Sequence, residues 1–238
     1  MRLLYIICLL LAAMIVFTAE GTIRRVPQDY AKIQLAINAA VNGDTVLVSE
    51  GTYVENLSIK KSIVLGSLYI IDGDTAHISR TIIDGSSPAH IDTASVINIK
   101  VGTNINTTVA GLTVTKGNGT RILGPDNYYY ICGGGINVIG GIAKIHHNRI
   151  IANKTPGNTY TPFAMGAGIG LHWINGFDIS DNLFQGNEST GRWCAAGAIA
   201  VSGDGSILRN KFINNSAVAK AIPGTGSIAG TGGGRKIC

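Results

Sequence analysis

The sequence Gly133-Gly134-Gly135-Ile136-Asn137-Val138 begins a pattern that occurs three times between residues 133 and 217. The second copy begins with Gly166-Ala167-Gly168-Ile169-Gly170-Leu171, and the third with Ala196-Gly197-Ala198-Ile199-Ala200-Val201. The isoleucines at 136, 169 and 199 are 33 and 30 positions apart, so the length of the unit varies while its phrases are retained. Variable spacing of this kind is typical of a solenoid, in which insertions fall in loops between stacked coils.

Each copy ends in a phrase that has an asparagine at both ends, at residues 148–153, 182–187 and 210–215. Three apolar runs with strand alternation in each copy predict three short strands per coil. Stacking the coils in parallel aligns one asparagine from each coil in a column: Asn148, Asn182 and Asn210. Because an amide both donates and accepts hydrogen bonds, we expect this column to be a structural ladder without a catalytic role.

The composition agrees with one elongated, all-β domain, a parallel β-helix. Of the 238 residues, 45% are hydrophobic, 14% are charged and 6% are aromatic, and 32 are glycine. A core of Ile, Val and Leu in short strands accounts for the scarcity of aromatic residues better than a helix bundle does. The net charge of +5 only mildly favours acidic partners.

One amphipathic helix is predicted ahead of the strands, and no second helix is predicted. The helical pattern extends from Asp29 to Val41, with Asp29 as the N-cap and Gly43 just past the end. Its apolar face consists of Tyr30, Ile33, Ile37 and Val41. Because an open solenoid end exposes unpaired backbone and apolar core, we expect this helix to cap the first coil.

Residues 1–21 have the pattern of an export signal. Met1-Arg2 is followed by an apolar run from Leu3 to Phe17, and small residues occupy the positions before a cleavage site after Gly21. An uncleaved anchor is the alternative, but the apolar run is shorter than the roughly 20 residues that a membrane span needs. The sequence therefore predicts a secreted, periplasmic or cell-surface protein with no stable membrane span after cleavage.

Residues 22–217 form the predicted β-helix domain, and residues 218–238 form a glycine-rich tail without an evident cap. We interpret the tail as an incomplete coil of a truncated chain, and pairing with a structure beyond the last coil is the alternative.

Signal cleavage leaves three cysteines, Cys132, Cys194 and Cys238. Cys132 and Cys194 precede the first and third copies, so one coil lies between them. At a coil rise of about 4.8 Å their sulfurs are too far apart for a disulfide unless the loops that carry them fold together. We expect free thiols.

The start of the domain resembles known families. The phrases at 26–40, Gly43–Val48 and Gly51–Asn56 are similar to the opening of pectin methylesterases and of periplasmic β-helix proteins of the copper-maturation type. With the three later copies, residues 22–217 resemble a right-handed parallel β-helix of the pectin-lyase-like superfamily. The resemblance implies that fold and says little about activity.

The catalytic groups of that superfamily are largely missing from the chain. The resemblance to pectin methylesterases stops at residues 51–56, and their later motifs with two carboxylates and an arginine have no counterpart. Where polygalacturonases use paired aspartates, Asp204 stands alone. No dense acidic group matches the calcium sites of pectate lyases, so no cofactor is predicted and calcium is an unsupported option.

Three longer, less periodic segments, 116–132, 154–165 and 188–195, are predicted to be loops along one edge of the solenoid. They contain most of the aromatic and arginine residues that can bind a sugar chain: Arg121, Tyr128, Tyr129, Tyr130, Tyr160, Phe163, Arg192 and Trp193. Aromatic rings can stack on sugars, and arginines can bind acidic groups. The alternative is that these rings pack the loops onto the coil body.

His172 is the single weak candidate for proton transfer, because it should face the loop-flanked groove beside Trp173 and titrate near neutrality. No partner carboxylate is identified by spacing. His146 and His147 are not predicted to share a metal ion, since adjacent strand residues point to opposite faces. No metal site is predicted.

The sequence favours an exported β-helix protein that binds extended polysaccharide, acidic chains included, or serves as a surface adhesion module, without a complete catalytic set. One alternative is a polysaccharide lyase or glycoside hydrolase that acts in the groove through His172. Another is a rigid structural spacer of a larger surface protein. The glycines at 166–170 do not form a nucleotide loop, because no strand-turn-helix unit surrounds them, and no nucleic-acid partner is expected.

Overall fold

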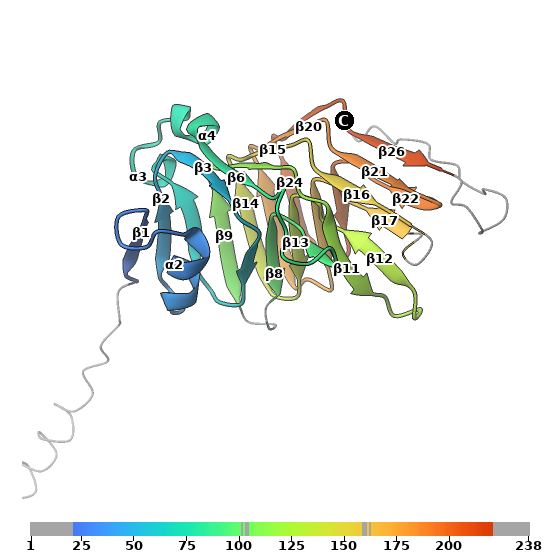
Figure 1. Cartoon of the computed structure of the whole chain (residues 1–238), viewed down its shortest axis with the longest axis horizontal. Coiled ribbons are helices and arrows are strands. Elements are labelled where there is room, and N and C mark those ends of the chain that lie inside the picture. The colour runs from blue at the N-terminus through green and yellow to red at the C-terminus, as the bar shows by residue number, and fades with distance from the viewer. Residues whose placement is uncertain (1–20, 101, 103–104, 159–160, 162, 221–238) are drawn as a thin grey trace, which may run out of the picture.

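The computed structural model describes residues 21–100, 102, 105–158, 161 and 163–220. Most of the predicted signal segment, Tyr160 and the tail from residue 221, with Cys238, lie outside the described residues. The described chain winds through successive coils that stack side by side from the N-terminal to the C-terminal end (Figure 1). None of the described helices is long and apolar enough to cross a membrane.

Three parallel sheets form the body of the molecule. Sheet A has the strands β1 (Ile23–Val26), β2 (Thr45–Val48), β5 (Val64–Ser67), β9 (Asn106–Ala110), β14 (Ile142–His146), β19 (Gly176–Ser180) and β24 (Gly205–Leu208). Sheet B has β3 (Gly51–Val54), β6 (Thr81–Asp84), β10 (Thr113–Thr115), β15 (Arg149–Ile151), β20 (Leu183–Gln185) and β25 (Lys211–Ile213). Sheet C has β4 (Leu57–Ile59), β8 (Ile97–Lys100), β13 (Ile136–Ile139), β18 (Ile169–His172) and β23 (Ile199–Val201). The predicted all-β parallel β-helix is confirmed.

The core lies inside these three sheets, where like residues stack on like residues. Ile97, Ile136, Ile169 and Ile199 pair in turn across sheet C. Ile136 and Ile169 are completely buried, as is Ile150 in sheet B. The repeat therefore builds a continuous apolar column, because strand alternation turns these positions inward in every coil.

The long segments predicted as loops form strands of their own, which corrects that prediction. Sheet D has β7 (Thr93–Ala94), β11 (Gly119–Leu123), β12 (Tyr129–Cys132), β17 (Phe163–Met165) and β22 (Trp193–Ala195), and sheet E has β16 (Lys154–Pro156), β21 (Glu188–Gly191) and β26 (Ser216–Ala219). Among the described strands, antiparallel pairing is confined to β11 with its two neighbours, β12 and β7. In Figure 1 much of this outer layer extends to one side of the three-sheet body. Successive insertions pair because their backbone groups need hydrogen-bond partners, which the next coil supplies at strand spacing.

The predicted amphipathic helix is shorter than expected, and it follows β1 instead of preceding all the strands. It is α2 (Ile33–Ala39), with Lys32 at the N-cap position. Asp29 does not cap it; its carboxylate accepts a hydrogen bond from the backbone N–H of Arg25 instead. Two further short helices, α3 (Tyr69–Asp72) and α4 (Ala76–Arg80), lie between β5 and β6, contrary to the prediction of a single helix.

Two asparagine ladders line the corners of sheet B. In the first, Asn148 Nδ2 donates to Asn182 Oδ1 at 3.0 Å, and Asn182 Nδ2 donates to Asn210 Oδ1 at 3.0 Å. A second ladder, not predicted, has the same pattern in Asn153, Asn187 and Asn215. Each ladder amide also accepts a hydrogen bond from the backbone N–H of the corner in the preceding coil. The asparagines therefore satisfy the sharp turns between strands.

Candidate functional site

Three aromatic side chains occupy one register position across sheet D. Tyr130 of β12 pairs with Phe163 of β17, which pairs with Trp193 of β22. The ring centroids of Tyr130 and Phe163 lie 4.9 Å apart, and those of Phe163 and Trp193 lie 6.3 Å apart. Tyr128 adds a fourth ring, 5.5 Å from Phe163. We call these four residues the aromatic column.

The two faces of sheet D differ in exposure. Ile131 and Ala164, which alternate with the aromatic column along β12 and β17, are buried at 7% and 0% exposure. Tyr128 and Trp193 are 58% and 40% exposed. At these positions the aromatic column therefore keeps more exposed surface than the residues that alternate with it, although Tyr129 of β12 is 42% exposed on the opposite face.

Arginine side chains flank the rings. The guanidinium carbon of Arg121 lies 4.7 Å from the centre of the Tyr129 ring, and that of Arg192 lies 5.9 Å from the Trp193 ring. Arg121 also forms an ion pair with Asp92 at 3.0 Å. Both arginines are placed for cation–π contact, which keeps the exposed rings in fixed orientations.

Tyr130 is anchored by a hydrogen bond at the end of the β11–β12 hairpin. Its hydroxyl donates to Asp126 Oδ2 at 2.5 Å. This bond and partial burial raise the pKa of Tyr130 to about 12, so the phenol stays protonated at neutral pH. Tyr130 is therefore a hydrogen-bonding and packing group.

Of the loop residues that the sequence singled out for sugar binding, seven lie on sheet D, on its β11–β12 hairpin or directly before β22: Arg121, Tyr128, Tyr129, Tyr130, Phe163, Arg192 and Trp193. Tyr160 lies outside the described residues. Tyr130 and Phe163 pack within the row, while Tyr128, Tyr129 and Trp193 keep exposed surface, and the role of these rings in sugar binding stays a prediction. The signal that sequence reasoning missed was the shared register, which spacing did not reveal.

His172 does not lie in an open groove, which corrects the expectation that it titrates near neutrality. Its side chain belongs to β18 and is only 8% exposed, and burial lowers its pKa to about 4. Nε2 makes no hydrogen bond to a described residue. The outward face of sheet C is covered here: Asn137 is fully buried, and a Cβ on Gly133 would come within 2.6 Å of the Asn137 Cα. His172 is therefore neutral at pH 7.

His146 and His147 point toward one another, contrary to the expectation of opposite faces. Their Nδ1 atoms are 3.1 Å apart, because His147 has left the strand and has a φ of +53° at the corner. Among the described residues, however, no group of three or more His, Cys, Asp or Glu side chains is arranged to hold a metal ion.

Cys132 and Cys194 are free thiols, as predicted. They belong to β12 and β22, and β17 lies between these two strands. Burial raises the pKa of Cys132 to about 12, so this thiol is unreactive at neutral pH.

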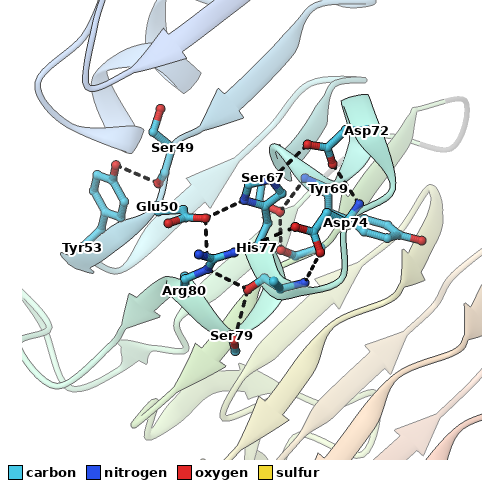
Figure 2. A network of polar contacts seen from close by, with 12 residues as sticks. Ser49, Glu50, Tyr53, Ser67, Tyr69, Asp72, Asp74, His77, Ser79 and Arg80 are labelled. Carbon is cyan, nitrogen blue, oxygen red and sulfur yellow. Dashed lines mark hydrogen bonds and ion pairs between the residues drawn. The ribbon is translucent and has the colours of Figure 1, made fainter.

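A second polar cluster, not predicted from the sequence, lies at α3 and α4 (Figure 2). His77 Nδ1 is 2.6 Å from Glu50 Oε1, and its Nε2 is 3.0 Å from Asp72 Oδ2. Arg80 Nε lies 3.1 Å from the same Glu50 oxygen. Partial burial lowers the pKa of His77, but the hydrogen bonds and charges of Asp72 and Glu50 outweigh burial and raise the pKa above its ordinary value.

No protein-family model matches the sequence, and no curated protein matches it. Among solved structures, the chain is similar to the pectin methylesterase from Aspergillus niger in deglycosylated form. The two share 13% sequence identity over 87% of this chain and 88% of that chain, with a TM-score of 0.33.

Proposed function

We propose that the protein binds an extended polysaccharide along the aromatic column of sheet D. The observation that supports this most directly is the row of partly exposed rings in register, with Arg192 against Trp193. Exposed aromatic rings with polar edges suit sugars, which present both apolar ring faces and hydroxyl groups. No catalytic group is needed for this role.

The bound chain is expected to run parallel to the coil axis. Successive strands of sheet D are about 4.8 Å apart, so Tyr128 and Trp193, two strands from one another, are separated by about 10 Å along that direction. An elongated ligand can contact several coils at once, whereas a single sugar cannot. A repeat protein extends its binding surface in this way.

Charge alone does not select acidic chains at this surface. Arg121 is paired with Asp92, and Asp126 binds Tyr130, so positive and negative groups are interspersed. Both neutral and acidic polysaccharides therefore belong in the test. The lyase or hydrolase alternative is weakened, because His172 is buried and neutral at pH 7.

The proposal is tested by measuring binding of the wild type, Trp193→Ala and Tyr128→Ala to an array of neutral and acidic glycans, followed by calorimetry on any hit. We expect Trp193→Ala to weaken binding about tenfold, because the loss of one stacked ring is worth about 1.4 kcal/mol. Trp173→Ala is the matched control, since Trp173 is 48% exposed but follows β18, away from the aromatic column.

Two results would contradict the proposal. One is the absence of glycan binding by the wild type, and the other is equal loss of binding in Trp173→Ala and Trp193→Ala. Incubating the protein with the same polysaccharides and assaying new reducing ends or unsaturated products tests the enzyme alternative in parallel.

A further inference from the structure

We propose that residues 68–80, which carry α3 and α4, form a pH-sensitive latch that His77 holds closed against the first coils. We call this segment the latch. It lies between β5 and β6, and Figure 2 shows His77 and Arg80 of this segment directed toward Glu50 of the coil body. The inference is independent of polysaccharide binding.

The geometry around His77 requires the charged imidazolium. Each of its two ring nitrogens faces a carboxylate, Glu50 at 2.6 Å and Asp72 at 3.0 Å. An ionised carboxylate only accepts hydrogen bonds, so both ring nitrogens must carry a proton. A neutral imidazole has a single N–H and would turn a lone pair toward one of the two carboxylates.

These two contacts connect separate parts of the structure. Glu50 lies between β2 and β3 of the body, Asp72 ends α3, and His77 lies in α4. The histidine therefore ties α4 both to the body and to α3. Losing either contact frees one side of the latch.

Other charged groups near His77 increase the effect of its deprotonation on the latch. Arg80 of α4 contacts Glu50 at 3.1 Å and approaches Asp74 of the α3–α4 turn at 3.9 Å. With His77 protonated, two cations face the three carboxylates of Glu50, Asp72 and Asp74. Deprotonation leaves Arg80 alone among them, and mutual repulsion of the carboxylates then favours opening.

Other contacts of the latch with the body do not involve the His77 side chain and are therefore insensitive to its proton. Thr113 of β10 donates a hydrogen bond from Oγ1 to Ile78 O at 2.7 Å. The Tyr69 ring stacks on the His147 ring with centroids 5.0 Å apart, and the Tyr69 backbone N–H donates to Ser67 Oγ of β5. Opening would uncover this corner of sheets A and B, where Ile78 is now 9% exposed.

The sign of the pH dependence follows from the raised pKa of His77. The stabilisation is fully present below the unfolded-state pKa of about 6.5 and is lost as the pH rises through the higher folded-state value. The latch is therefore closed in mildly acidic solution and loosens toward alkaline pH.

Hydrogen exchange of the full chain, followed by mass spectrometry from about pH 5 to 9 and corrected for intrinsic exchange rates, tests this inference. Protection of residues 68–80 should fall as the pH rises, by about tenfold for each pKa unit by which folding raises the pKa of His77. Peptides from β14 and β15 should not change. His77→Gln should remove the pH-dependent step, and the control His90→Gln, an exposed histidine next to Asp92, should retain it.

A second measurement begins with the wild type and does not depend on whether His77→Gln folds. The pKa of His77 in the wild type, followed by NMR, should lie above that of a model histidine, and Glu50→Gln should lower it. A pH-independent latch in the wild type, a step that persists in His77→Gln, or an ordinary pKa for His77 would overturn the inference.

Discussion

Asp44 is the residue on which the first coil depends most clearly. Its carboxylate is 1% exposed and accepts three hydrogen bonds, from the backbone N–H groups of Thr22 and Val41 and from Arg24 Nε. Burial raises the pKa of Asp44, but the hydrogen bonds and the charge of Arg24 outweigh burial and lower it. One ionised side chain thus joins β1, the end of the helix segment and β2.

We predict that Asp44→Asn destabilises the protein at pH 7 by about 3 kcal/mol, because Arg24 and two buried N–H groups lose their anionic partner. A lowered folded-state pKa gives stability above the unfolded value of about 3.9 and loses it as the pH falls through the folded value. Urea unfolding should therefore show a difference between variant and wild type that shrinks below about pH 4. An equal difference at pH 7 and pH 3 would contradict this account.

Residues inside the coils could be predicted from the sequence, whereas residues between coils could not. Ile136, Ile169 and Ile199 recur in nearly identical phrases, so alternation alone assigns them to the core. The sequence does not show whether Phe163 pairs with Tyr130 or with a neighbouring residue, because the two insertions that carry them differ in length and can be aligned in several ways. The register between β12 and β17 is visible only in the folded structure.

Helix α2 is held at both ends by charged residues of the following coil. The Glu55 carboxylate accepts hydrogen bonds from the backbone N–H groups of Ile33 and Gln34 at 2.9 and 3.0 Å. At the other end, Lys61 Nζ donates to the carbonyl groups of Ile37, Asn38 and Ala40. An anion at the start of a helix and a cation at its end both complement the helix dipole and the unpaired terminal groups.

We predict that Glu55→Ala and Lys61→Met each lower the free energy of unfolding by about 1 to 2 kcal/mol, the usual cost of losing a helix cap. Hydrogen exchange should locate the loss in α2 and β1, with β20 unchanged. Lys60→Met is a control, because Lys60 is exposed and adjacent in sequence. A loss in Lys60→Met as large as that in Lys61→Met would refute the capping role.

For helix α2, too, the sequence predicts the contacts within the element but not those with a distant part of the chain. Its apolar face was recognisable, and Ile33 and Ile37 are buried as the pattern indicates. Its true cap was not recognisable, because Glu55 is 22 residues from Ile33 along the chain and reaches it only after the first coil has closed. The latch was missed for a related reason: α3 and α4 are too short for a helical period to stand out.

At the scale of the molecule, the second asparagine ladder places two glycosylation sequons in the core. Asn153-Lys154-Thr155 and Asn187-Glu188-Ser189 both have the acceptor pattern. Asn153 and Asn187 are completely buried, and the Thr155 and Ser189 hydroxyl groups hydrogen-bond at 2.7 Å. The two sequons thus arise because a column of stacked amides lies beside a column of stacked hydroxyl groups. A glycan on Asn153 or Asn187 is incompatible with the folded coil.

We predict that production in a secretory host that attaches N-linked glycans strongly reduces the yield of folded protein relative to a host that does not. The double variant Thr155→Val, Ser189→Ala should restore much of the yield, because it removes both sequons and replaces the paired hydroxyl groups together, at a cost of about 1 kcal/mol. Asn106→Gln, which removes an exposed sequon, should leave the yield unchanged. Mass spectrometry of the folded fraction checks the cause, since glycans at Asn153 or Asn187 in folded protein would show that the ladder tolerates them.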